Sequence, residues 1–160
     1  MTDADDKRPG EIALPFDPAG RATDAGLVFI GRVRSPWQSR DDAPRNMARA
    51  RERGQPAAIE IDAAYRPGLL GLEAGTALIV LTFMHRARRD LIVQVPRNAE
   101  EPSGVFALRS PVRPNPIGLD VVKLVAIDHA AGVLTIDATD CLDGTPVLDL
   151  KPWFPTTDVG

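Results

Sequence analysis

Apolar and polar residues alternate over short stretches of this chain, and that pattern predicts β-strands. Residues 58–62 alternate apolar and acidic side chains, as a strand with one buried face does. Residues 77–84 form a nearly continuous apolar run rich in branched side chains, which is typical of a strand covered on both faces. The same criteria predict further strands at residues 27–33, 91–95, 119–127 and 133–138.

The last two predicted strands are joined by residues 128–132, a connection of hairpin size. In the first of these strands, the alternation places Val121, Val125 and Ile127 on one face. In the second, it predicts that the side chains of Leu134, Ile136 and Ala138 point inward. We assign Asp120 and Lys123 to a solvated face of the first strand.

Helical signals are weak by comparison. Residues 47–53 favour a short helix, and no segment of ten or more residues has a convincing amphipathic period. About seven short strands at loop spacing predict a mainly β fold, a small antiparallel β-barrel or curled sheet with few short helices. Residues 1–24 lack periodicity and are predicted to be a flexible N-terminal tail, which leaves residues 25–160 as a single domain.

The composition fits one folded domain and argues against several kinds of site. The chain has 160 residues, of which 44% are hydrophobic, and it contains one cysteine and two histidines. A disulfide framework is thereby excluded, and a metal cofactor is not expected. The acidic start has no feature of a signal peptide, and no apolar run reaches the length of a membrane span, so we expect a cytoplasmic protein with no membrane contact.

Charge is distributed unevenly along the chain. Residues 1–28 hold six acids and three bases, residues 29–113 nine acids and fourteen bases, and residues 114–160 seven acids and two bases. Sixteen of the nineteen bases are arginines, which suit two-pronged recognition of carboxylate or phosphate. Within the cationic middle, residues 38–55 are long for a mere connection, which leaves open a lid, a binding loop or disorder.

Common nucleotide and hydrolase signatures do not occur. The chain has no G-x-G-x-x-G after a strand, no G-x-x-x-x-G-K-[ST] and no G-x-S-x-G, so neither a Rossmann site, nor a P-loop, nor a nucleophile elbow is supported. The polar residues instead form four clusters at strand ends or on loops: residues 44–46, 85–86, 109–118 and 140–153. If the strands close a barrel, these clusters can converge and offer the groups that bind an amino-acid-bearing nucleoside.

The stiffest cluster is the loop at residues 107–119. Three of its prolines alternate with Arg113, Asn115 and Ile117, so most of its backbone angles are preset. Such a loop presents a guanidinium and a carboxamide at little entropic cost on binding. From spacing alone, a rigid connection between strands remains the alternative.

Taken in order, the clusters resemble the signature of a known family. The residues that carry the resemblance are Ile30 to Pro36, Pro44-Arg45-Asn46, Gly71-Leu72-Glu73, Phe83 to Arg86, Arg109 to Gly118, and Asp143 to Trp153. They are similar to the TsaA-like (YaeB-like, TrmO) family of S-adenosylmethionine-dependent tRNA adenosine N6-methyltransferases. The resemblance covers residues 29–155, and R-S-P-x-R-P-N-P-I-G followed by D-G-T-P-V-x-D-x-K-P is its most specific part.

The resemblance implies a β-barrel-like methyltransferase that works as a homodimer with its cofactor site near the interface. It implies methylation of N6 of threonylcarbamoyladenosine beside the tRNA anticodon, with S-adenosylmethionine as methyl donor. Matched residue by residue, it implies that cofactor contacts come from Pro44, Arg45, Asn46, His85, Arg86, Arg109, Leu119, Cys141, Leu142, Asp143 and Gly144. Arg45 or Arg109 would hold the methionine carboxylate, and Asp143 a ribose hydroxyl or the amino group.

Methyl transfer from a sulfonium mainly requires alignment of donor and acceptor. An acceptor for the N6 hydrogen still helps, and Asn115 is the first candidate, ahead of Asp140, Asp149 and Lys151. Asp149 and Lys151 have a structural alternative, an ion pair at a strand edge. For the RNA we predict contacts from Arg113, Arg88 and Arg89.

Two departures from the family pattern bear on the substrate. Arg86 stands where tRNA-acting members usually have glutamine, and the C-terminal domain of longer members is not found after Trp153. Two alternatives therefore stay open: a methyltransferase of the same fold that acts on a small molecule, and a non-catalytic S-adenosylmethionine-binding protein.

Overall fold

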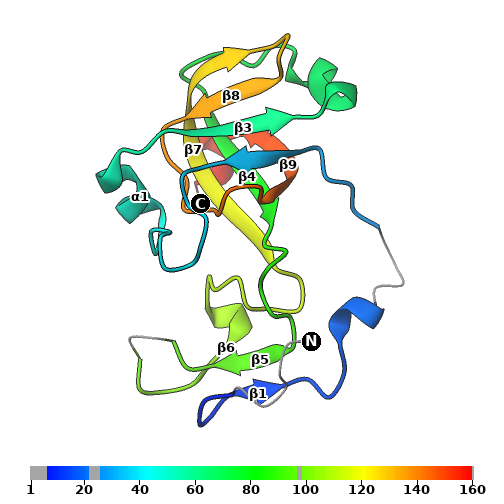
Figure 1. Ribbon diagram of the computed structural model, residues 1–160, viewed down its shortest axis with the longest axis vertical. Helices are drawn as coiled ribbons and strands as arrows, with labels where there is room; N and C mark the ends of the chain where they lie inside the picture. Colours follow the sequence, from blue (N-terminus) through cyan, green and yellow to red (C-terminus); the bar gives the residue numbers. More distant parts are fainter. Residues whose placement is uncertain (1–6, 22–25, 97–98, 160) are drawn as a thin grey trace. The chain divides into compact units, whose positions relative to one another are not determined.

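Six strands close an antiparallel barrel, which confirms the predicted fold class. The computed structural model describes residues 7–21, 26–96 and 99–159 (Figure 1). Around the barrel the strands follow the order β2-β3-β8-β7-β4-β9. Their bounds are β2 Gly31–Arg34, β3 Ala57–Ile61, β4 Ala77–Phe83, β7 Ile117–Asp128, β8 Val133–Ile136 and β9 Pro146–Pro152.

A second, three-stranded sheet has the order β1-β5-β6. It consists of β1 Ile12–Ala13, β5 Leu91–Gln94 and β6 Ser103–Gly104. The chain divides into two compact units: one contains this sheet and uses residues 1–26 and 84–117, and the other contains the barrel and uses residues 27–83 and 118–160. The single domain predicted for residues 25–160 therefore includes parts of both units.

The helices are short, as expected. They are η1 Pro18–Arg21, α1 Met47–Arg53, η2 Ala63–Leu69, η3 Val105–Ala107 and α2 Pro155–Asp158. The bounds of α1 match the prediction, because Asn46 caps its first turn and Gly54, at φ 57°, ends it in the left-handed region. None of the helices in the described part of the chain is long and apolar enough to cross a membrane.

The barrel core is formed by inward side chains from several strands. Those with almost no exposed surface include Val33, Ile59, Leu78, Leu124, Leu134 and Val147. The inward face predicted for β8 is confirmed, since Leu134, Ile136 and Ala138 are all buried.

The face of β7 that carries Val121 and Val125 points outward. Val121 is 38% and Val125 53% exposed, whereas Val122 and Leu124 are buried. The register of β7 against β8 shifts between Leu124 and Ala126, so that strict alternation fails there. The outer face of β7 is therefore apolar. Alternation groups these residues on one face, but it does not show that this face points outward.

Several element limits differ from those predicted. The strand predicted at residues 27–33 begins only at Gly31, and the preceding Leu27, Val28 and Phe29 are exposed. Residues 12–13, placed by the sequence in a flexible tail, pair with β5 instead. Residues 1–6 and 22–24 of that predicted tail lie outside the described residues.

Among the described glycines, Gly31 leaves the least room for a side chain. A Cβ at this position would lie 2.1 Å from the carbonyl oxygen of Glu60 on β3, a distance that real Cβ atoms do not show. Since β2 pairs with β3 here, the side chain can be accommodated only if the two strands move apart.

We expect Gly31→Ala to lower the free energy of unfolding by about 1–3 kcal/mol, the usual cost of overpacking. Gly68→Ala is the matched control, because no atom lies within 4 Å of its Cβ position, and it should change stability by less than about 0.5 kcal/mol. Urea titration measures both. Equal stability of the two variants would contradict the tight β2–β3 contact.

Candidate functional site

The segment at residues 139–145 contains the predicted cofactor contacts Cys141 to Gly144, and we call it the predicted cofactor segment. It lies along the end of β2 and the residues that follow it. The amide of Gly144 donates to the carbonyl of Val33 at 2.9 Å, and the amide of Asp143 donates to the carbonyl of Trp37 at 2.8 Å. Gly144 has a φ of 77°, which a glycine adopts without strain. These bonds hold a segment without regular secondary structure in one conformation.

Side chains of the preceding Ser-Pro-Trp sequence complete this attachment. The hydroxyl of Ser35 donates to the carbonyl of Cys141 at 2.8 Å. The indole Nε1 of Trp37 donates to the carbonyl of Thr139 at 2.8 Å and is buried. Because Trp37 bonds through both its indole and its carbonyl, it fixes two points of the segment at once.

The side chain of Asp143 contacts the end of β2. Its Oδ1 accepts from the amide of Ser35 at 3.1 Å, and its Oδ2 lies 3.6 Å from Nη1 of Arg34. Arg34 also donates from Nε to Glu60 at 2.9 Å. A carboxylate has about four acceptor positions, so Asp143 can still accept from a ligand hydroxyl or ammonium group.

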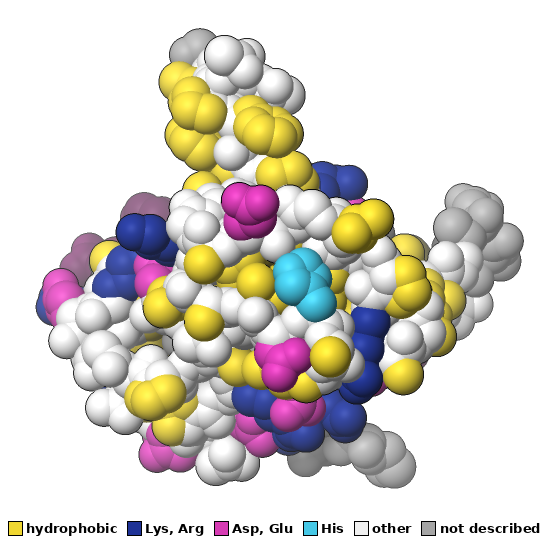
Figure 2. Space-filling view, turned by 90° about the horizontal axis from the view of Figure 1, so that it is seen from above, with side chains coloured by type: hydrophobic (Ala, Val, Ile, Leu, Met, Phe, Trp, Pro, Cys, Tyr) yellow, Lys and Arg dark blue, Asp and Glu magenta, His cyan; other side chains and the backbone are white. Residues whose placement is uncertain are grey.

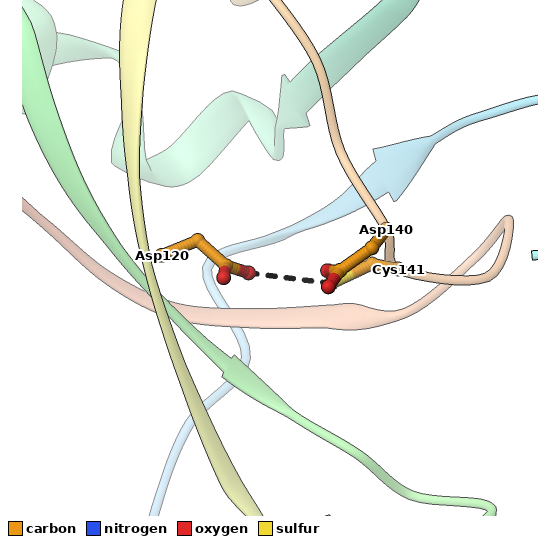
Figure 3. A group of neighbouring side chains, drawn as sticks. All are labelled: Asp120, Asp140 and Cys141. Carbon is orange, nitrogen blue, oxygen red and sulfur yellow. Dashed lines mark hydrogen bonds between the residues drawn. The ribbon is translucent and has the colours of Figure 1, made fainter. Parts of the chain in front are cut away.

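Asp140 and Cys141 lie next to a third residue, Asp120, which projects from β7 (Figure 3). One ligand atom from each of the three side chains lies within 4.8 Å of the others, and Sγ of Cys141 is 3.9 Å from Oδ2 of Asp120. Both carboxyl groups are half-buried. This arrangement places two acids beside the predicted cofactor segment.

Cys141 is a buried neutral thiol. Burial, reinforced by the charges of Asp120 and Asp140, raises the pKa of Cys141 to about 12. The thiolate, which is the nucleophilic and metal-binding form, is therefore scarce at neutral pH. Cys141 packs here as a small apolar side chain.

Asp120 is the site residue that sequence reasoning missed. It was assigned to a solvated face, but it is half-buried and faces Asp140. A signal was present in the sequence, because alternate residues of a strand share a face. Asp120 is therefore on the same face of β7 as Val122 and Leu124, which are buried.

The three residues at 44–46 serve different purposes. Asn46 caps α1, its side chain accepting from the amide of Arg49 at 2.9 Å, and Pro44 is buried. Arg45 is exposed and lies between them. Only Arg45 offers a charged group to a ligand, while its two neighbours hold the loop and start the helix.

Asp149 and Lys151 form an ion pair on β9, with Nζ 2.8 Å from Oδ2. Both side chains are about half exposed, so the pair adds little to stability. This geometry matches the structural alternative given by the sequence, in which the two residues form an ion pair at a strand edge.

The other predicted site residues belong to the unit with the three-stranded sheet. His85 and Arg86 are exposed in the turn that follows β4, and Arg109 and Asn115 are exposed on the proline-rich loop. Pro116 in the same loop is buried, and its carbonyl accepts from the amide of Met84 at 2.8 Å. The loop is therefore held at one end while its polar side chains reach solvent.

The arginines predicted to contact RNA make bonds within this same unit. Arg89 donates from Nε to the carbonyl of Pro114 at 2.6 Å and from Nη2 to Oδ1 of Asn115 at 3.4 Å. Arg113 donates to the carbonyls of Leu108 and Ser110 at 3.0 and 3.3 Å, which bends the loop back on itself.

Arg88 forms a two-pronged pair with Asp90, both distances being 2.8 Å. The Arg88 guanidinium holds the pKa of Asp90 below its usual value. These arginines stabilise the proline-rich loop and its neighbourhood, a role that the sequence alone did not suggest.

The predicted site is thus divided between the two units. The barrel unit brings together the predicted cofactor segment, Asp120 and, on the adjoining stretch of β7, the exposed Leu119. The unit with the three-stranded sheet carries His85, Arg86, Arg109 and Asn115.

Comparison with known proteins finds a family and several relatives. Residues 32–159 match the tRNA-methyltransferase O N-terminal domain. The probable S-adenosyl-L-methionine-binding protein VirR of Rhizobium radiobacter is 39% identical over 145 residues, which cover 91% of this chain and 78% of VirR. The tRNA (adenine(37)-N6)-methyltransferase of Escherichia coli K12 is 34% identical over 134 residues, covering 79% of this chain and 56% of the enzyme.

A solved structure is also similar. The crystal structure of TrmO from Pseudomonas aeruginosa superposes with a TM-score of 0.64 at 30% identity, covering 86% of this chain and 60% of that one. The chain therefore spans somewhat more than half the length of these two methyltransferases. Since the domain match takes in nearly all of the barrel unit and the proline-rich loop, the chain belongs to the tRNA-methyltransferase O N-terminal domain family.

Proposed function

We propose that the protein transfers a methyl group from S-adenosylmethionine to N6 of an adenosine in tRNA. The observation that carries the proposal is the fixed segment at residues 139–145, in a chain whose family and relatives are named for this cofactor and this reaction. More specifically, we propose that the acceptor is threonylcarbamoyladenosine next to the anticodon. A tRNA substrate also implies that the protein acts in the cytoplasm.

The residues present fit this cofactor. Asp143 has acceptor positions left for a ribose hydroxyl or the amino group, and the exposed guanidinium of Arg45 or Arg109 suits the methionine carboxylate. Leu119 and Leu142 provide apolar surface for the adenine. When bound, the cofactor supplies an activated methyl group on a sulfonium, so the protein has chiefly to align the acceptor.

Asn115 is the proposed acceptor of the N6 hydrogen. It is exposed and flanked by prolines, and its Oδ1 accepts only one long hydrogen bond, from Arg89 at 3.4 Å. A second lone pair of that oxygen is free to accept from N6 as positive charge develops. Asp140, Asp149 and Lys151 are the second candidates for this role.

We further propose a homodimer with the cofactor site near its interface. Support comes from the outer face of β7, where Leu119 is 44%, Val121 38% and Val125 53% exposed in a single chain. Exposed apolar faces of this kind mark association surfaces. As the composition of the chain predicts, we propose no metal cofactor for the site.

A non-catalytic role in binding S-adenosylmethionine is the second candidate. One observation favours it: this chain covers 78% of VirR, which is named only for binding, but 56% of the E. coli methyltransferase.

Nucleoside analysis decides between the two candidates. In a deletion strain, we expect the methylated form of threonylcarbamoyladenosine to disappear from hydrolysed tRNA and to return with the wild-type copy. Mass spectrometry of the nucleosides measures this. Unchanged amounts in the deletion strain, together with saturable cofactor binding by the purified protein, would favour the binding role.

Substitutions on the proline-rich loop should separate cofactor binding from transfer. Arg109→Ala is expected to weaken cofactor binding by roughly tenfold or more, the cost of one charge-assisted contact. Asn115→Ala is expected to leave cofactor affinity unchanged and to slow transfer by about 10²-fold, the typical share of a proton acceptor. Calorimetry and single-turnover rates measure the two effects, and equal loss of cofactor affinity in both variants contradicts the assignment.

Val125→Glu tests the dimer. A charge at a half-exposed position cannot be buried in an apolar interface without a large cost, so we expect the variant to be monomeric. Leu70→Glu, which places the same charge on an apolar residue that is 92% exposed and lies outside β7, is the control and should keep the wild-type mass. Light scattering coupled to size exclusion reads out both, and a wild-type monomer rejects the dimer outright.

A further inference from the structure

A cluster of arginines gathers around α1 in the barrel unit. Arg45, Arg49 and Arg53 follow one another at intervals of four residues and, with Glu52, line a hollow of about 420 Å³. Arg40 lies in the turn at residues 39–43, and the carbonyl of Asp42 in that turn accepts from Arg53. We call Arg40, Arg49 and Arg53 the arginine surface; Arg45 adjoins it.

The arginine surface keeps most of its charge available. Among the described residues, neither Arg40 nor Arg45 has a hydrogen-bond or ion-pair partner. Arg49 pairs with Glu52 at 2.7 Å, but both side chains are more than half exposed, and such pairs exchange readily for a stronger anion. On the face that Figure 2 shows, several dark blue side chains lie next to magenta ones.

The helix below this surface is rigidly attached. Arg51, on the opposite side of α1, donates from Nε to Asp137 at 2.8 Å and from Nη2 to the carbonyl of Val121 at 2.8 Å. Burial alone would raise the pKa of Asp137, but Arg51 and the amide of Lys123 hold it below its usual value, so the pair stays charged at neutral pH. The outward arginines are thus presented from a fixed base.

Arg53 connects the arginine surface to the cofactor segment. Its guanidinium lies 5.1 Å from the ring centroid of Trp37 and donates to the carbonyl of Asp42. The same Trp37 bonds to Thr139 and Asp143, as described above. One buried side chain therefore touches an arginine on one side and the predicted cofactor segment on the other.

An RNA phosphate backbone matches this arrangement best. Planar guanidinium groups bind phosphate oxygens with two parallel hydrogen bonds, and a row of them on one face suits a chain of phosphates. The arginines first predicted for this task, Arg88, Arg89 and Arg113, instead make bonds within their own unit.

We propose that the arginine surface binds the phosphate backbone of the RNA substrate and so delivers the acceptor nucleoside to the cofactor segment beside it. This inference rests on the proposed function. It names Arg40, Arg49 and Arg53 as RNA contacts and leaves Arg45 to the cofactor.

The test uses the double variant Arg40→Gln/Arg49→Gln, which avoids Arg53 because that residue also packs on Trp37. The control is Arg32→Gln/Arg66→Gln, which removes the same charge from the barrel unit: Arg32 pairs with Glu60 on β3, and Arg66 lies on η2, away from α1 in Figure 1. Thermal melting confirms that both variants fold.

Binding to unmodified tRNA is measured at several salt concentrations. Loss of two phosphate contacts should raise the apparent Kd roughly tenfold or more at low salt and reduce the slope of log K against log salt by about 1.5. The control should keep the wild-type Kd and slope, and calorimetry should give the same S-adenosylmethionine affinity for all three proteins.

The possible results separate the two proposals. A wild-type enzyme that methylates tRNA, with a double variant of unchanged Kd and slope, overturns the arginine surface and leaves the proposed function standing. An equal loss of tRNA affinity in the control variant also overturns the arginine surface, since positive charge at any position would then be enough to bind tRNA. A wild-type protein that neither binds nor methylates tRNA overturns both.

Discussion

The hydrogen-bonded contact between residues 33–37 and 139–145 is the constraint on which the candidate site depends. One stretch is the end of a barrel strand, and the other is a segment without regular structure that contains half of the predicted cofactor contacts in the barrel unit. Backbone bonds at Val33 and Trp37, with side-chain bonds from Ser35 and Trp37, leave that segment one conformation. Because Trp37 also packs against Arg53, the same constraint relates the α1 arginines to the cofactor segment.

Much of the fold could be predicted because its signals are local. Alternation identified β3 and β8. Both ends of α1 were predicted correctly, because Asn46 caps its start and Gly54 ends it. Two features depended on distant partners and were missed. Alternation did not show which face of β7 packs against the core, so the outward position of Val121 and Val125 was missed, and β1 forms only because β5 offers it an edge.

The candidate site was predictable as a list of residues but not as a set of roles. Family resemblance identifies Asn46 and Asp143 without revealing that one caps a helix and the other accepts from Ser35. Nor does spacing show that Arg89 and Arg113 bond to their own loop, because the partners are carbonyls that become neighbours only on folding. Asp120 is the opposite case, since its parity with Val122 and Leu124 was visible in the sequence.

The central claim is that the segment held by residues 33–37 is a wall of an S-adenosylmethionine site. Calorimetric titration of the purified protein with S-adenosylmethionine tests it most directly, with Asp143→Ala and the surface variant Asp128→Ala compared at equal concentration. The account predicts saturable binding by the wild type and by Asp128→Ala, and a loss of roughly tenfold or more in affinity for Asp143→Ala. No heat with the wild type, or equal affinity in all three proteins, would contradict it.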